Sequence, residues 1–171
     1  IETFVHGAMC YGYSGQCLFS SMLGERSGNR GRCAGPCRLP YDVLYQGLML
    51  NTKEEKYPLS LKDLCTLDVL PQLIEAGIDS FKIEGRMKTP EYVAFVTGMY
   101  RKYMDFYESN PENYRVSEND RKQLQKRFSR GGMQAGYYFT HNGRELVTLD
   151  KPGYSESTAD IVPTEIKPID L

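Results

Sequence analysis

Five cysteines carry the clearest chemical signal in this sequence of 171 residues, and all of them lie within its first 65 residues. Thiolates on glycine-rich loops can converge on a soft metal or on a cluster whose sulfurs accept backbone N–H groups. The spacing is C-x6-C-x15-C-x3-C-x27-C, without the paired C-x2-C knuckles of zinc ribbons or the C-x2-C-x2-C run of ferredoxins. It therefore predicts a metal site and leaves a structural zinc and an iron–sulfur cluster open. The cysteines are Cys10, Cys17, Cys33, Cys37 and Cys65.

The thiols have two further interpretations that bear on where the protein works. Free cysteines also occur as small buried apolar residues, and this is the alternative to a metal site. An odd number of cysteines without an export signal favours reduced thiols over a disulfide framework. We therefore expect a cytoplasmic protein.

Charged residues gather at two places that could bind an anion. Lys82, Glu84 and Arg86 alternate at the end of a predicted strand, so one face would present all three to a carboxylate or phosphate. A plain surface strand end would show the same pattern. The segment from Cys10 to Pro40, which we call the cysteine loop, carries Arg30 and Arg32 among other arginines. These guanidinium groups could hold RNA phosphates, offset the charge of a thiolate site, or simply be solvated.

Proteolysis finds little support in the residues. The sequence has two histidines, His6 and His141, and neither an H-E-x-x-H nor a G-x-S-x-G motif. A dyad of His6 with a nearby thiol is the remaining possibility for a nucleophile.

The elements that must position these residues follow from hydrophobic periodicity. Alternation predicts strands at 1–6, 41–50 and 78–84, and short β-like runs at 136–140 and 145–149. Helical spacing predicts helices at 18–23, at 90–107 and at about 118–129. Ser60 followed by Asp63 resembles an N-cap, so a helix is expected from Ser60 to Gly77, with Pro71 opening a second segment.

Strands that alternate with helices predict an α/β fold with parallel strands. A closed barrel needs roughly 250 residues, so this chain would supply only part of one. We expect residues 1–130 to form that part and residues 131–171 to begin a small β-rich domain. The net charge is −1, so nucleic-acid binding would need a local patch, and no apolar run approaches the length of about 20 residues that crosses a bilayer.

Four segments, in order along the chain, resemble the peptidase U32 family. Residues 2–20 are similar to its signature, E-x-F-x2-G-[small]-[aliphatic]-C-x4-G-x-C-x-[aliphatic]-S, although Phe19 replaces the usual aliphatic residue. Residues 29–38, 60–65 and 79–88 are similar to the motifs that follow in the family.

The resemblance implies a longer protein in which a TIM-barrel-like domain precedes a small β domain, with this chain as the C-terminal part. Family members are named for collagenase-like proteolysis, and others hydroxylate RNA, including prephenate-dependent formation of 5-hydroxyuridine in tRNA. The resemblance therefore implies tRNA, a prephenate-like molecule, and a second family subunit or the missing N-terminal half as partners, with no membrane. Several members bind a [4Fe–4S] cluster, which carries over to Cys10, Cys17, Cys33 and Cys65, with Cys37 as the alternative.

Overall fold

The centre of the molecule is a mixed four-stranded sheet. A computed structural model describes residues 1–86, 88–127, 129–139, 141 and 143–153. Its strands are β1 (Glu2–Gly7), β5 (Asp63–Cys65), β6 (Ser80–Ile83) and β7 (Met133–Gln134), in the order β6-β1-β5-β7. The pairs β1–β6 and β5–β7 are parallel, whereas β1 and β5 are antiparallel. The α/β prediction is confirmed in this coarser form, and a barrel remains a prediction.

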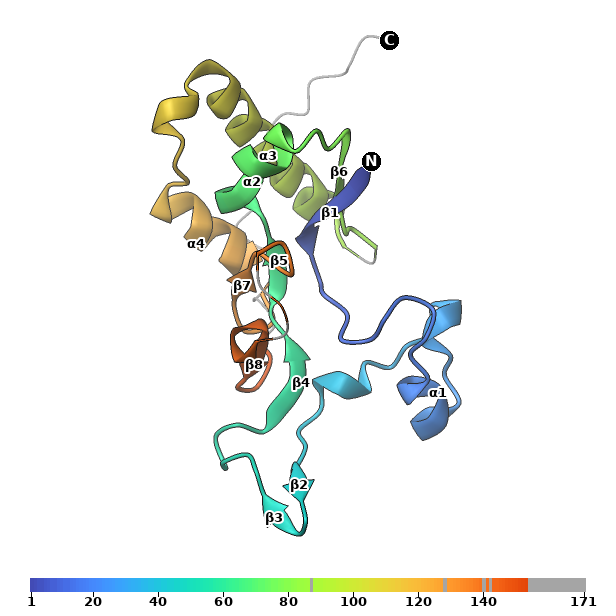
Figure 1. Cartoon of the computed structure of the whole chain (residues 1–171). Helices are drawn as coiled ribbons and strands as arrows, with labels where there is room; N and C mark the ends of the chain where they lie inside the picture. The colour runs from blue at the N-terminus through green and yellow to red at the C-terminus, as the bar shows by residue number, and fades with distance from the viewer. Residues whose placement is uncertain (87, 128, 140, 142, 154–171) are drawn as a thin grey trace.

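Helices cover one end of this sheet (Figure 1). The long helix α3 (Pro90–Ser109) begins where Thr89 accepts a hydrogen bond from the Tyr92 backbone N–H at 3.3 Å. Its apolar face packs into the core with η3 (Leu67–Val69), α2 (Leu70–Glu75) and α4 (Glu118–Arg127). None of the described helices is long and apolar enough to cross a bilayer. Fully or almost fully buried core residues are Val5, Leu67, Leu70, Val96 and Leu124.

Shorter elements surround the sheet. The cysteine loop contains α1 (Phe19–Gly24) and the 3-10 turns η1 (Gly28–Arg30) and η2 (Pro36–Arg38). Beyond it, β2 (Leu44–Tyr45) and β3 (Leu48–Met49) form a hairpin, and β4 (Tyr57–Leu61) pairs with β8 (Val147–Leu149). The turns η4 (Pro111–Asn113) and η5 (Arg144–Leu146) complete the described elements.

Two sequence predictions were wrong in instructive ways. The single strand expected at 41–50 is a hairpin, because Gln46 and Gly47 both adopt positive φ, as a tight hairpin turn requires. The helix expected from Ser60 begins at Leu70 instead, and Ser60 lies at the end of β4. Its hydroxyl is not an N-cap but accepts a hydrogen bond from Arg38 at 2.9 Å. Long-range strand pairing has overridden the local cap pattern.

The last strands of the described residues pair with strands from earlier in the chain. No strand covers 136–139, and β7 precedes that stretch, while residue 140 lies outside the described residues. Since β7 pairs with β5 and β8 with β4, the strands described after residue 131 extend sheets that begin earlier in the chain. The division at residue 130 remains a prediction, and residues 154–171 lie outside the described part.

Candidate functional site

The cysteine loop leaves the sheet at the end of β1, runs out to α1 and returns past η2 toward β4 (Figure 1). Backbone turns rather than apolar packing give it shape. The Ser27 carbonyl accepts hydrogen bonds from the backbone N–H groups of Arg30 at 3.2 Å and Arg32 at 3.0 Å. Irregular backbone of this kind can aim several side chains at one point, which regular strands cannot do.

Three thiols of this loop, those of Cys10, Cys17 and Cys33, lie within electrostatic range of a fourth, Cys37. Burial raises the pKa of the Cys37 thiol, the charge of Arg38 opposes the rise, and Cys10, Cys33 and Cys17 add to it. The Cys33 Sγ also accepts a hydrogen bond from the Gly35 backbone N–H at 3.2 Å. Amide donors to sulfur are a feature of iron–sulfur sites.

Gly12 allows this gathering of thiols. A methyl group built at its Cα would lie 2.7 Å from the Cβ of Cys17 and 3.3 Å from its Sγ. Any side chain at this position would therefore push Cys17 away from the turn that follows Cys10.

Arg38 ties the cysteine loop to the sheets. Its Nη1 donates to the Ser60 hydroxyl at 2.9 Å and to the Leu61 carbonyl, and its Nη2 donates to the Met9 carbonyl at 2.7 Å. The guanidinium therefore joins the exit of β1 to the end of β4, directly beside Cys37. Its role here is to hold the loop in place, which the sequence pattern did not separate from that of the other arginines.

Cys65 lies outside the cysteine loop. It sits on β5, where its Cα pairs with that of His6 on β1. Burial raises the pKa of its thiol, and hydrogen bonds from the Leu67 backbone and Tyr100 lower it by less. The charged groups that act most on this thiol are Asp68 and Arg121. The electrostatic neighbours of Cys37 are thus the other thiols of the cysteine loop and those of Cys65 are Asp68 and Arg121, and the ligand set stays a prediction.

The three charged residues at the end of β6 separate. Lys82 donates to Glu2 at 2.9 Å and stands over the Phe4 ring, so it is engaged on β1. Glu84 turns back to accept a hydrogen bond from the Arg86 backbone N–H at 3.0 Å. Arg86 reaches in another direction, because its Nη2 lies 3.1 Å from the point where a Gly31 Cβ would stand.

A buried polar group at the same strand ends went unnoticed in the sequence. Asp63 is 1% exposed, accepts the Arg130 backbone N–H at 2.7 Å through Oδ2, and has no hydrogen-bond partner for Oδ1 among the described residues. Burial raises the pKa of Asp63. Burial, followed by the charge of Arg130, lowers the pKa of nearby Lys88 to about 8. Asp63 resembled a helix cap in the sequence, and only the folded structure shows its burial.

His6 belongs to the same buried group. It is 2% exposed, its Nδ1 lies 3.4 Å from the Tyr100 hydroxyl, and burial followed by the charge of Lys88 lowers its pKa to about 4. Tyr100 donates to the Val5 carbonyl at 2.7 Å and accepts the Thr66 backbone N–H at 3.0 Å. Because the Cys65 thiol has a raised pKa, the thiolate that a dyad with His6 needs is disfavoured.

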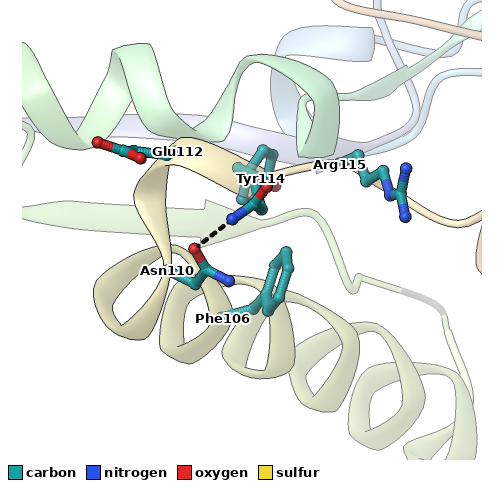
Figure 2. Close-up of a pocket in the computed structure, with 6 residues that line it drawn as sticks. Phe106, Asn110, Glu112, Tyr114 and Arg115 are labelled. Carbon is teal, nitrogen blue, oxygen red and sulfur yellow. Dashed lines mark hydrogen bonds between the residues drawn. The ribbon is translucent and has the colours of Figure 1, made fainter.

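One pocket lies at the far end of α3, away from the thiols (Figure 2). It has a volume of about 500 Å³, opens to solvent, and is bordered by Phe106 and Tyr114. Next to them, Asn113 Nδ2 donates to Asn110 Oδ1 at 2.8 Å. Its polar lining presents no converging group of acids, bases or thiols, so it is not the centre of the candidate site.

The donor set of the cysteine loop fits an iron–sulfur cluster in its chemistry. Four thiols on a single irregular segment, with an amide donor to one sulfur, are what such clusters use. In the described part of the chain, no three His, Cys, Asp or Glu side chains already surround the position of a single metal ion. The thiols thus share a region without being closed around one ion.

Comparison with known proteins adds a family to this geometry. Residues 1–148 match the profile of Peptidase family U32. The chain is 40% identical over 162 residues to tRNA hydroxylation protein P1 of Bacillus subtilis, which covers 91% of this chain and 36% of that protein.

Other relatives carry different names. The 23S rRNA 5-hydroxycytidine C2501 synthase of Escherichia coli is 38% identical over 90% of this chain and 24% of its own length. A collagenase of Porphyromonas gingivalis is 39% identical over 81% of this chain and 38% of its own. The chain thus spans between a quarter and two fifths of these proteins, and no solved structure matches it.

Proposed function

This chain belongs to peptidase family U32, and on that premise we propose that it is the cysteine-bearing part of an enzyme that hydroxylates a uridine in tRNA. The observation that carries the proposal is the gathering of Cys10, Cys17, Cys33 and Cys37 on one arginine-rich loop. Relatives named for hydroxylation of tRNA and for a 5-hydroxycytidine in ribosomal RNA support the reaction class.

We propose the same four thiols as ligands of a [4Fe–4S] cluster, with zinc as the alternative metal. When bound, such a cluster supplies one-electron chemistry at a potential tuned by hydrogen bonds to its sulfurs. The residues of this chain contribute the rest: the Gly35 N–H donates to Cys33 and Arg38 fixes the loop against Met9 and Leu61. We place Cys37 as the fourth ligand because it lies in the cysteine loop with the other three, and Cys65 on β5, the ligand that the family resemblance implies, is the alternative.

The co-substrate and the partners rest on the family alone. Prephenate as the co-substrate follows from the resemblance to prephenate-dependent members. The remaining length of the relatives, or a second family subunit, would complete the enzyme, because this chain matches only 36% of the tRNA hydroxylation protein. We place the reaction in the reducing cytoplasm, where thiols remain available for metal.

Hydrolysis is the competing function, and it rests on relatives named collagenase. The geometry gives it little, since His6 is buried and the pKa of the adjacent Cys65 thiol is raised. Cleavage of gelatin by the purified full-length protein, abolished by Cys65→Ser, would favour the peptidase over the hydroxylase.

The direct test is the nucleoside content of tRNA in a strain that lacks every U32-family gene. Mass spectrometry should show loss of 5-hydroxyuridine, recovery with the full-length gene, and no recovery with its Cys10→Ser variant. Met22→Ala is the matched control, because this side chain is 81% exposed on α1 in the same loop, and it should restore the nucleoside. An unchanged level of 5-hydroxyuridine after deletion would refute the proposal.

A further inference from the structure

The end of β6 and the cysteine loop meet at a single glycine. The Arg86 Nη2 lies 3.1 Å from the position of a Cβ on Gly31, whose φ is +74°. Gly31 stands directly between Arg30 and Arg32, so the guanidinium of Arg86, three residues after β6, reaches the backbone between two more arginines. Consecutive Cα atoms are about 3.8 Å apart, so the Arg30 and Arg32 side chains both originate next to the point that the Arg86 guanidinium reaches.

These three arginines differ from Lys82 in that no ion pair is found for them among the described residues. All three are exposed, and within the described ranges none of their guanidinium groups has an ion pair or a hydrogen-bond acceptor. Lys82, on β6 itself, is instead paired with Glu2. An exposed group of cations that the protein leaves without anions is an electrostatic footprint for an external polyanion.

We propose that Arg30, Arg32 and Arg86 form one phosphate-binding surface for the RNA backbone, beside the thiols of the cysteine loop. The inference rests on the proposed function for the identity of the RNA and deepens it by naming the contacts. Guanidinium groups suit this task because their planar donors match phosphate oxygens in pairs. The surface adjoins Cys33, so bound RNA would lie next to the thiols.

The salt dependence of the binding constant reports how many phosphate groups the protein contacts. Each phosphate contact adds about 0.7 to 0.9 to the slope of log K against log salt concentration. Fluorescence anisotropy of this chain with a labelled, unmodified tRNA transcript should show that Arg30→Gln, Arg32→Gln and Arg86→Gln each lower the slope by about that amount. Lys82→Gln removes the same charge from a paired residue and should leave the slope unchanged.

A pair of glycine variants tests the placement of Arg86 independently of its charge. Gly31 and Gly15 share φ +74°, but a methyl group at Gly15 meets nothing within 4 Å. Both variants therefore carry backbone strain from the same positive φ, and only at Gly31 does the added methyl group press against Arg86, by a few tenths of an ångström. We expect Gly31→Ala to lower the salt slope by no more than Arg86→Gln does, Gly15→Ala to leave it unchanged, and the double variant of Gly31→Ala with Arg86→Gln to match Arg86→Gln alone.

Equal losses of slope for Lys82→Gln and Arg86→Gln would overturn the proposal, because net charge alone would then explain binding. Displacement of tRNA by inorganic phosphate, beyond that by chloride at equal ionic strength, would reveal a small-anion site and would also overturn it. Its failure is separable from that of the proposed function. If the arginine variants leave the salt slope unchanged while gene deletion abolishes 5-hydroxyuridine, only the surface is refuted. If the variants lower the slope while gene deletion leaves 5-hydroxyuridine unchanged, only the hydroxylation is refuted.

Discussion

Ionisable groups are exposed in the cysteine loop and buried in the body of the molecule, by which we mean the central sheet together with α2, α3 and α4. In the body, Asp63, His6 and Lys88 are held together in or beside the core, and burial shifts the pKa of each. In the cysteine loop, Arg30, Arg32 and the thiols of Cys10 and Cys33 are exposed. Buried polar groups need hydrogen-bond partners within the protein, whereas exposed cations and thiols are solvated and remain available to bind a ligand.

The two regions also differ in what holds them. The body closes over a contiguous apolar core, while α1 in the loop leaves Leu23 64% exposed. This contrast teaches that stability and ligand binding are divided between segments of one chain. Variants should therefore separate the two properties, and the following predictions test that separation.

The largest effect is expected from Leu70→Ala in the body. Leu70 is fully buried in α2, so truncation leaves a cavity and should lower the free energy of unfolding by about 2–5 kcal/mol. Leu23→Ala in the loop should change it by less than about 0.5 kcal/mol. Urea denaturation of the metal-free chain measures both. A loss of similar size for Leu23→Ala would mean that the loop is packed like the body, and the contrast would fail.

The next effect is acid sensitivity from His6. Its pKa is about 4 in the folded chain and 6.5 ordinarily, so the unfolded chain binds the proton first as pH falls. Its contribution is complete above pH 6.5 and is lost as pH falls through 4. At about 1.4 kcal/mol for each pKa unit, the loss is about 3 kcal/mol. His6→Gln should remove this part of the pH dependence in denaturation curves.

The control for His6 titrates in a different window. Burial pushes the pKa of Asp120 upward, but hydrogen bonds from Lys102, Tyr103 and Ser117 outweigh it and hold the pKa below 3.8. Asp120→Asn should therefore lower stability by a constant amount above about pH 4, and the difference from wild type should shrink only as pH falls below that value. The difference between wild-type and variant curves cancels groups common to both, such as Asp63. If the His6→Gln difference is flat between pH 4 and 6.5, the buried histidine is not neutral in the folded chain.

Sequence patterns predicted the elements whose structure is decided locally. The alternation at 78–84 contains β6, and the apolar stripe at 90–107 lies within α3, since period alone determines which face is buried. The cap pattern at Ser60 failed because β4 pairs with β8, far away in the chain. Local propensity carries no information about such pairing.

The candidate site shows the same limit. The sequence located the thiols and arginines of the cysteine loop, because their density on a glycine-rich segment is itself unusual. It could not show that Arg86 meets Gly31 or that Cys65 pairs with His6, since both depend on how distant segments come together. Grouping Cys37 with Cys10 and Cys17 likewise depends on the return of the loop past Arg38.

The most direct test of the central claim is the iron and acid-labile sulfide bound by the anaerobically reconstituted chain and its single Cys→Ser variants. We expect about four of each per wild-type chain, the content of a [4Fe–4S] cluster. Serine at Cys10, Cys17, Cys33 or Cys37 should abolish most of it, and Cys65→Ser should retain it. Loss with Cys65→Ser and retention with Cys37→Ser, or one zinc per chain without sulfide, would contradict the claim.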